Sequence, residues 1–319
     1  MAGAEQVRRW RPGRRLHWAS LLSPHRRGPG DPTHRRLGQG QDVVWWRATR
    51  NPDGSVLLRL APSGDEVVAH AWGDGAVRAL DQLPRLLGAD DDPGSFEPQH
   101  PLLVEAHRRL PDLRIGATDA VGEALFPACL EQVVTGQEAY AAFRALTRKY
   151  GEPAPGPAAD ADSPAYRMML PPTAEAWARI PTWEYLKAGV EERRSRPLVT
   201  AARRGGALER TLQREVADVD HALQSLPGIG PWTSAETRQR AHGDGDAWSI
   251  GDYHIGGMIT HALTGEKQGD DVALELLAPY VGHRYRVQLL ISATVGLPPR
   301  RGPRRALPTH TPRGTRGRS

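Results

Sequence analysis

The spacing of apolar residues changes character once along the chain, near residue 95. Over residues 43–72, short runs rich in Val, Leu and Trp alternate with the turn sequences Asn-Pro-Asp-Gly and Ser-Gly-Asp, a pattern typical of short antiparallel strands. Residues 76–87 have the spacing of a short amphipathic helix, and the polar stretch 89–94 contains Pro and Gly. We therefore predict a small antiparallel sheet in the N-terminal part and a domain boundary near residue 95.

From residue 101 onward, the apolar positions follow helical spacing and strand signals nearly vanish. The stretch 152–164 is rich in Pro, Ala and Asp and is expected to form a loop. Short helices are expected after it, around residues 174–179, 183–188 and 192–204, with more helices from Leu208. The predicted fold class is α+β, with a small N-terminal antiparallel-sheet domain that includes a basic N-terminal arm (1–95), an all-α domain (96–299) and a disordered Arg-rich tail (300–319).

Charge and composition narrow the classes of function without selecting one. The 319 residues carry a formal net charge of +5 and a pI near 9.6, which favours a polyanion such as DNA but leaves RNA and anionic membrane surfaces open. The one cysteine, Cys129, lies in an apolar stretch and is expected to be buried, so neither an internal disulfide nor a Cys-ligated metal site is expected. Because no apolar run reaches the length of a membrane span and the Arg-rich N-terminus lacks a signal segment, a cytoplasmic protein is expected.

The string Leu-Pro-Gly-Ile-Gly-Pro-Trp-Thr, residues 226–233, joins one apolar helical segment to another that begins at Pro231. Gly228 and Gly230 are expected to adopt positive φ and to leave their N–H groups uncovered, while Ile229 anchors the turn in the core. Proline suits the first position of a helix, whose free N–H groups and dipole then face the hairpin. The string is therefore either a clamp for a DNA phosphate that ignores base sequence or an ordinary turn between two helices.

This string resembles the hairpin of the helix-hairpin-helix DNA glycosylase superfamily, in which an essential Asp lies across a cleft from the hairpin. Asp252, in Ser-Ile-Gly-Asp-Tyr-His, has the family spacing, twenty residues beyond Trp232. Residues 102–152 look like the first helices of the alkylpurine (3-methyladenine type II) branch, so the resemblance covers about residues 95–297, and the N-terminal sheet fits this branch by pattern. The resemblance implies a monomeric enzyme of base-excision repair, without a membrane partner and associated with the nucleoid, that flips a damaged base out of double-stranded DNA.

The resemblance assigns Asp252 as the catalytic carboxylate. Breaking an N-glycosidic bond leaves positive charge on the sugar, and a carboxylate beside the anomeric carbon stabilises that charge and can orient or deprotonate the attacking water. An alkylated purine is already cationic, so its departure needs no strong general acid. The alternative for Asp252 is a helix N-cap, and the two roles can coexist.

Three further residues are candidates for the base pocket. Trp232 occupies the hairpin position at which glycosylases that also cut the DNA backbone carry a nucleophilic Lys, and Trp cannot form a Schiff base, so base removal without lyase activity is expected. In the alkylpurine branch, a Trp here lines the pocket and attracts a cationic base; core packing is the alternative. Tyr253 is a second candidate. Glu236 stands where an aromatic pocket residue is common, and it either lines the pocket or is a solvated helix residue.

The resemblance also implies contacts to DNA. It places Thr233, together with the amides of Gly228 and Gly230, near a phosphate. Gln132 and Val133 correspond to residues that fill the space left by the flipped base, although Glu131 stands where the family usually has a Gly.

A monovalent cation, Na⁺ or K⁺, is the one ion that the resemblance implies. The main-chain carbonyls of Gln224, Leu226 and Gly228 would surround it at the hairpin, and no other cofactor is expected.

Two other functions remain open from the sequence. One is a monofunctional glycosylase for another damaged or mispaired base, because the absence of Cys ligands excludes only the iron–sulfur branch. The other is a non-catalytic DNA-binding module, which would need only the hairpin and a basic surface. Metal hydrolases and nucleotide-binding enzymes are disfavoured, since the chain has no H-E-x-x-H motif, no P-loop motif and no Rossmann fingerprint after a strand.

Overall fold

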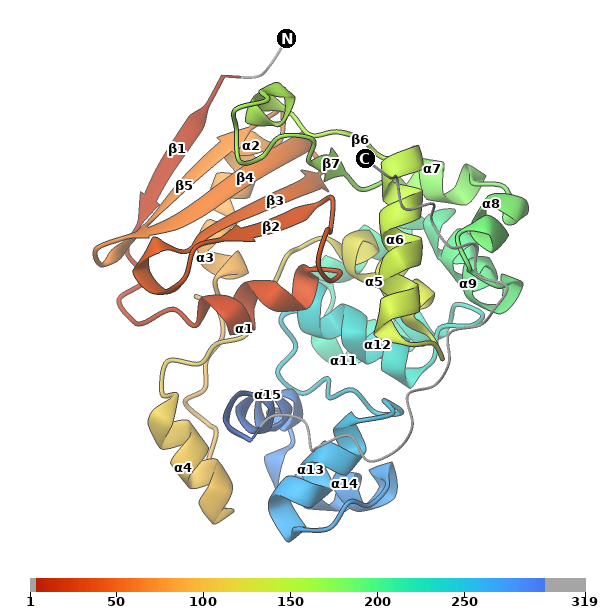
Figure 1. Ribbon diagram of the computed structural model, residues 1–319. Coiled ribbons are helices and arrows are strands. Elements are labelled where there is room, and N and C mark those ends of the chain that lie inside the picture. Colours follow the sequence, from red (N-terminus) through yellow and green to blue (C-terminus); the bar gives the residue numbers. More distant parts are fainter. Residues whose placement is uncertain (1–3, 296–319) are drawn as a thin grey trace, which may run out of the picture.

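A five-stranded antiparallel sheet forms most of the N-terminal part of the computed structural model, which describes residues 4–295 (Figure 1). The strand order is β1-β5-β4-β3-β2, and each neighbouring pair is antiparallel. The predicted turns join the three central strands. The strands are β1 (Gln6–Trp10), β2 (His34–Leu37), β3 (Val44–Asn51), β4 (Gly54–Ser63) and β5 (Glu66–Trp72).

Both faces of this sheet are covered, because successive side chains of a strand point to opposite sides. Trp45 faces a core that includes Leu58 and Leu60 and is closed by the short helices α1 (Trp18–Leu22), α2 (Ala76–Asp81) and α3 (Leu83–Leu86). The next residue, Trp46, packs on the opposite face against residues 154–170. This segment directly follows β6 (Glu152–Pro153) and ends in β7 (Met169–Leu170), which pairs with β6, so part of the predicted loop 152–164 is an ordered cover for the sheet.

The N-terminal segment contains two edge strands that the sequence pattern did not predict. β1 pairs along its whole length with β5, and β2 pairs with β3. Arginines at the exposed positions of these two edge strands hide the alternation of apolar residues that would have indicated strands. The predicted helix 76–87 is divided at Gln82, because Pro84 lacks the N–H that a continuous helix requires.

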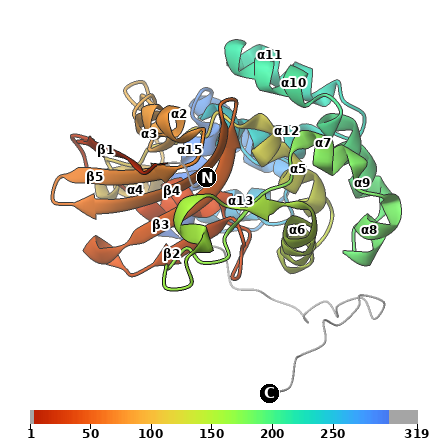
Figure 2. The ribbon, with the colours of Figure 1, turned by 90° about the horizontal axis from the view of Figure 1, so that it is seen from above.

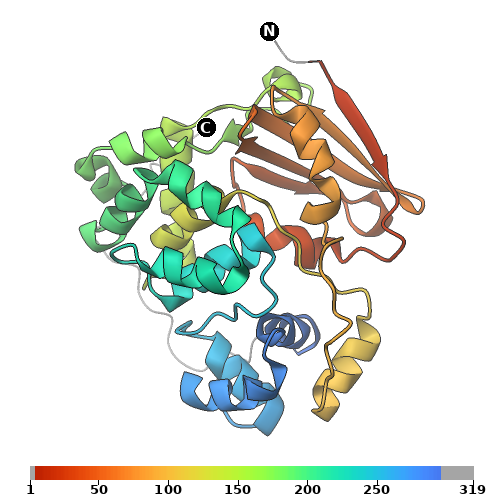
Figure 3. The ribbon, with the colours of Figure 1, turned by 180° about the vertical axis from the view of Figure 1, so that it is seen from behind.

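The rest of the described chain is helical, as predicted, apart from the small β6-β7 pair (Figures 1 and 2). It has two separate hydrophobic cores: one is built from helices between residues 121 and 241, and the other joins α4 to the last three helices. Figure 3 shows the blue helices α13, α14 and α15 at the lower end of the molecule, at the same level as the yellow helix α4. The helices are α4 (Pro101–Arg109), α5 (Val121–Glu131), α6 (Gly136–Tyr150), α7 (Ala174–Arg179), α8 (Thr182–Lys187), α9 (Glu192–Ala202), α10 (Gly205–Glu209), α11 (Val216–Gln224), α12 (Pro231–Thr237), α13 (Ile255–Thr264), α14 (Asp270–Leu277) and α15 (Arg284–Thr294).

Several sequence-based expectations concern burial and the ends of the chain. Cys129 is fully buried, as expected, and burial raises the pKa of its thiol. The predicted Arg-rich tail, residues 300–319, lies outside the described residues. Over residues 4–295, no helix combines the length and the apolar character that crossing a membrane requires.

Two buried histidines should make the stability of the folded protein depend on pH. Burial lowers the pKa of His34 to about 4, against the opposing effect of Asp31, and burial also holds the pKa of His25 well below its ordinary value. Unfolding restores an ordinary pKa to both histidines, so below pH 6.5 the unfolded chain binds more protons than the folded protein. The free energy of unfolding that is present above pH 6.5 therefore falls as the pH drops toward 4.

We expect the titration of His34 alone to lower the free energy of unfolding by about 1.4 kcal/mol when the pH falls from 7.5 to 5.5. Urea unfolding curves at both pH values measure the loss. His34→Gln cannot titrate and should reduce the difference by about that amount; an unchanged difference would show that His34 is not neutral in the folded protein.

Candidate functional site

The predicted hairpin lies between α11 and α12, and one of its two glycines has the predicted conformation. Gly228 has a φ of +84°, whereas Gly230 has a φ of −95° and a ψ of −178°, so positive φ at Gly230 was a wrong prediction. The reason is that Gly230 is the extended residue that begins α12. Ile229 is 4% exposed and packs in the first helical core, and Pro231 occupies the first turn of α12, both as predicted.

The residue after α5 ties that helix to the hairpin. The side-chain amide of Gln132 donates to the carbonyl oxygen of Gly228 at 3.0 Å and to the hydroxyl of Thr233 at 2.8 Å. Thr233 is 2% exposed, so its hydroxyl faces the protein rather than solvent. The hairpin is therefore a rigid element, and its contacts with a phosphate through Gly228, Gly230 and Thr233 stay predictions.

Val133 has a strained backbone conformation and an exposed side chain. Its φ of +54° lies in the left-handed region, which is unfavourable for a β-branched residue, and 80% of its surface is exposed. The Gln132 bonds fix the chain just before it, and a capping box formed by Thr135 and Glu138 begins α6 just after it. An apolar tip held out of the core beside the hairpin has the geometry that a wedge would need, and the wedge itself stays a prediction.

Asp252 uses its two carboxylate oxygens differently. Oδ1 accepts the main-chain N–H groups of His254 at 2.7 Å and of Ile255 at 3.1 Å, which lie at the start of α13, although the N-cap residue of that helix is His254 rather than Asp252. Oδ2 accepts the indole N–H of Trp232 at 3.3 Å. Among the described residues, no cationic side chain forms an ion pair with this carboxylate. One oxygen of Asp252 therefore has a structural role, and the other is held toward the hairpin.

Trp232 contacts this carboxylate, and Tyr253 is the residue that follows Asp252 in the chain. Trp232 is half-buried and belongs to neither helical core, so the alternative of a core Trp is wrong. Tyr253 is 86% exposed; the edge of His254 packs against it, and the ammonium of Lys267 lies 5.9 Å from the centre of its ring. Both aromatic side chains are therefore accessible beside Asp252, and their contact with a base stays a prediction.

Glu236 is not the solvated helix residue that was one interpretation of the sequence. It is 8% exposed, its Oε1 accepts the hydroxyl of Ser249 at 2.6 Å, and its Oε2 pairs with Arg240 at 2.7 Å. Burial lowers the pKa of Arg240, but the carboxylates of Glu236 and Glu131 outweigh this effect, so the pKa is raised overall. Glu236 therefore carries a paired negative charge inside the protein, one helical turn beyond Trp232.

Glu131, the unusual residue before Gln132, forms a second buried pair. Arg27, from the loop before β2, places its Nε 2.7 Å from a carboxylate oxygen of Glu131. Burial raises the pKa of Glu131, with Arg27 and Arg240 acting against this effect and the carboxylates of Glu236 and Asp252 adding to it. No sequence motif indicated this cluster. The four-residue spacing of Glu236 and Arg240 is a usable signal for one pair, but Arg27 and Glu131 are far apart in sequence.

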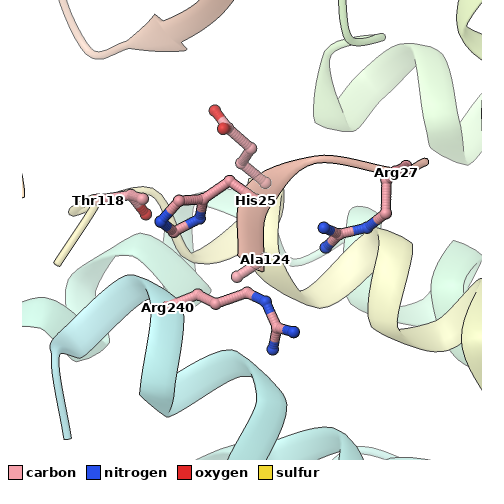
Figure 4. Close-up of a pocket in the computed structure, with 6 residues that line it drawn as sticks. His25, Arg27, Thr118, Ala124 and Arg240 are labelled. Carbon is pink, nitrogen blue, oxygen red and sulfur yellow. The ribbon is translucent and has the colours of Figure 1, made fainter. Parts of the chain in front are cut away.

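A small recess lies next to this cluster, between the loop before β2 and the helical region (Figure 4). It has room for about one water molecule, and neither Asp252 nor Trp232 lines it. Figure 4 shows arginine side chains reaching it from two separate segments. Its lining residues are His25, Arg27, Thr118, Glu123, Ala124 and Arg240.

The three carbonyls proposed for a monovalent cation fit such an ion in chemistry, since main-chain oxygens suit hard cations. The carbonyl oxygen of Leu226 accepts the N–H of Ile229 at 3.0 Å, and that of Gly228 accepts the Gln132 amide. Each keeps a second lone pair for an ion. The ion site, which also involves Gln224, stays a prediction, and no group of three or more His, Cys, Asp or Glu side chains in residues 4–295 is arranged to hold a metal.

The comparisons with known proteins find similarity in structure but not in sequence. No family model and no curated protein matches the sequence. A 3-methyladenine DNA glycosylase from Archaeoglobus fulgidus matches with a TM-score of 0.68 at 16% identity, over 89% of this chain and 97% of that one. The structure of MBOgg1 in complex with a low-affinity DNA ligand matches with a TM-score of 0.58 at 14% identity, over 81% of this chain and 96% of that one. The Clostridium acetobutylicum 8-oxoguanine glycosylase/lyase in complex with double-stranded DNA matches with a TM-score of 0.56 at 13% identity, over 81% of this chain and 96% of that one. At these identities, the comparisons establish a shared fold.

The two hairpin glycines should respond differently to substitution. A Cβ on Gly228 would lie 2.4 Å from Cγ of Pro197 at a positive φ, so Gly228→Ala should lower the free energy of unfolding by about 1–3 kcal/mol. A Cβ on Gly230 meets nothing within 4 Å, so Gly230→Ala is the matched control and should change it by less than about 0.5 kcal/mol. Chemical denaturation of the three proteins measures both values, and equal losses would contradict this account of the hairpin.

Proposed function

We propose that this chain, which has the fold of the helix-hairpin-helix DNA glycosylases, is a monofunctional DNA glycosylase that hydrolyses the N-glycosidic bond of alkylated purines in double-stranded DNA. One observation carries the proposal: Oδ2 of Asp252 faces the hairpin and accepts the indole N–H of Trp232, while Oδ1 is fixed by two main-chain N–H groups. A carboxylate held in this way needs little reorganisation to stabilise positive charge that develops on a sugar.

The chemistry follows from this carboxylate. As the bond between base and sugar lengthens, positive charge develops at the anomeric carbon, and Asp252 stabilises it and orients or deprotonates the attacking water. A purine that alkylation has made cationic leaves as a neutral base, so the site needs no strong acid to protonate it. The aromatic rings of the half-buried Trp232 and the exposed Tyr253 would attract such a base through cation–π interactions.

The absence of lyase activity is part of the proposal. A glycosylase that also cuts the backbone needs an amine nucleophile, and the hairpin holds Trp232 instead. The three lysines of the sequence, Lys149, Lys187 and Lys267, all lie outside the hairpin string. The expected product is therefore an abasic site in an intact strand.

Binding of DNA would rely on the backbone of the hairpin and on the segment after α5. The amides of Gly228 and Gly230 would hold a phosphate without reading bases, and Val133 would enter the space left by the extruded nucleotide. The positive net charge adds an attraction that does not depend on sequence. We expect the protein to act as a monomer that is associated with the nucleoid.

Base release by wild type and Asp252→Asn tests the proposal. Asn keeps an oxygen that can accept the N–H groups at the start of α13 but has no charge, so the fold should persist while release of methylpurine falls on the order of 100-fold. Free base is quantified from duplexes that contain N-methylated purine, uracil or 8-oxoguanine, and strand breaks should appear only after alkali. Asp246→Asn is the matched control, because Asp246 pairs with Arg284 and does not contact Asp252.

The outcomes separate three functions. Release of methylpurine by wild type and by the Asp246 variant alone supports the proposal. Preferential release of uracil or 8-oxoguanine would replace the substrate and keep the reaction. If no duplex loses a base and the Asp252 variant binds DNA as tightly as wild type, the chain is a non-catalytic DNA-binding module.

A further inference from the structure

The turn that holds Val133 out in solvent lies between two helices that a loop of the N-terminal part contacts. Residues 132–135 join α5 to α6, and the loop is residues 26–31, between α1 and β2. Arg27 extends from this loop (Figure 4), and its Nε lies 2.7 Å from a carboxylate oxygen of Glu131, the last residue of α5. The N-terminal part is therefore tied to the chain immediately before the turn.

The same loop also lies against α6. Arg144 of α6 donates to the main-chain carbonyl oxygen of Arg27 at 3.3 Å. Gly28 has a φ of +72°, and a Cβ on it would lie 2.8 Å from the ring of Tyr140, in the second turn of α6. Only glycine combines this φ with so close an approach. The loop therefore connects both helices that carry the turn.

Arg27 is fixed within the N-terminal part. It is 4% exposed, its main-chain N–H donates to the carboxylate of Asp31 at 2.5 Å, and its Nη1 donates to the carbonyl oxygen of Pro24 at 2.9 Å. Asp31 also accepts the main-chain N–H of Thr33, directly before β2, at 2.8 Å. The guanidinium group therefore has a fixed position relative to the sheet, and a force on Glu131 is transmitted to the sheet.

Local preferences do not explain a carboxylate at Glu131. At the C-terminus of a helix it faces the negative end of the helix dipole, and desolvation of a buried ion pair offsets most of its attraction. Its place in the chain gives a better reason. The next residue, Gln132, bonds to the hairpin, and the one after it is the strained Val133. The pair thus attaches α5 to the sheet just where Gln132 attaches it to the hairpin.

We propose that Arg27 and Glu131 are positioning residues for base extrusion, and that their pair braces the end of α5 so that Val133 stays in place when it enters the base stack. This inference rests on the proposed function and deepens it, because it gives the N-terminal part a role in extrusion without contact to DNA. Stacked bases resist the entry of an apolar side chain, and a strained turn without support would relax under that resistance. Bracing therefore matters most where a paired base must be extruded.

The test compares release of one base from two duplexes that differ in the cost of extrusion. Each duplex contains a single 7-methylguanine, opposite cytosine in one and opposite an abasic analogue in the other. An unpaired base is cheaper to extrude, so the paired-to-unpaired ratio of single-turnover rates reports on extrusion and is insensitive to the chemical step. Arg27→Met keeps the bulk of the side chain and leaves Glu131 unpaired, so this ratio should fall on the order of tenfold.

A second buried pair provides a matched control. Arg47 of β3 pairs with Glu123 at 2.7 Å and also joins the N-terminal part to α5, but near the start of that helix and away from the turn. Arg47→Met should lower the thermal stability as Arg27→Met does and leave the ratio within about twofold of wild type. If Arg27→Met does not fold, Glu131→Gln removes the same ion pair with little change of shape, and the same fall is expected.

Removal of the apolar tip tests whether the pair acts through it. Val133→Gly suits the positive φ and should lower the ratio by itself. Adding Arg27→Met to Val133→Gly should then lower the ratio by less than about twofold more, because no tip remains to be braced.

Each outcome decides for or against bracing. A ratio that falls in Arg27→Met, stays in Arg47→Met and responds little to Arg27→Met in the Val133→Gly background supports it. Equal falls in the two arginine variants, or equal losses for the paired and the unpaired base, would show that the pair only holds the two parts together. A Val133→Gly protein with the wild-type ratio overturns this inference and leaves the glycosylase function standing, whereas a wild-type protein that releases the base from neither duplex overturns the proposed function itself.

Discussion

The hydrogen bond between the indole of Trp232 and the carboxylate of Asp252 joins two parts of the helical region that fold around separate cores. The hairpin belongs to the first core through Ile229, and the segment that carries Asp252 belongs to the second core through Trp248 and Ile255. Neither core alone can place both residues. The candidate site therefore exists only when the two cores are correctly docked, which makes its geometry sensitive to changes far from it.

Buried ion pairs hold the N-terminal part against this docked helical region. Arg27 reaches Glu131 at the end of α5, and Arg47 of β3 pairs with Glu123 near the start of the same helix at 2.7 Å. Pairs of this kind add little net stability, because desolvation offsets the Coulomb attraction, yet breaking one leaves an expensive unpaired charge. They therefore define one docking geometry for the sheet and penalise others. The N-terminal part in this way contributes to the surroundings of the site.

Local patterns predict the turn of the hairpin, and the resemblance supplies Asp252 as a candidate, whereas contacts between residues distant in sequence determine the rest of the site. The hairpin depends on Gly228, Ile229 and Pro231, whose roles follow from backbone preference and burial of one side chain. The burial of Glu236 depends on a hydroxyl thirteen positions away and on how a loop folds over α12, which no local pattern encodes. The two edge strands were not predicted for a related reason, because their pairing with β5 and β3 is a contact between distant parts of the chain and their arginines give no apolar alternation.

The strain at Val133 shows how such a site can be maintained. A β-branched residue with positive φ costs on the order of 1–3 kcal/mol and relaxes unless its surroundings leave no alternative. Here the hydrogen bonds of Gln132 to the hairpin fix the chain on one side, and the capping box of α6 at Thr135 fixes it on the other. Only two residues separate these anchors, so the backbone between them cannot relax. The same bonds that make the hairpin rigid therefore also hold an apolar side chain out in solvent beside the site.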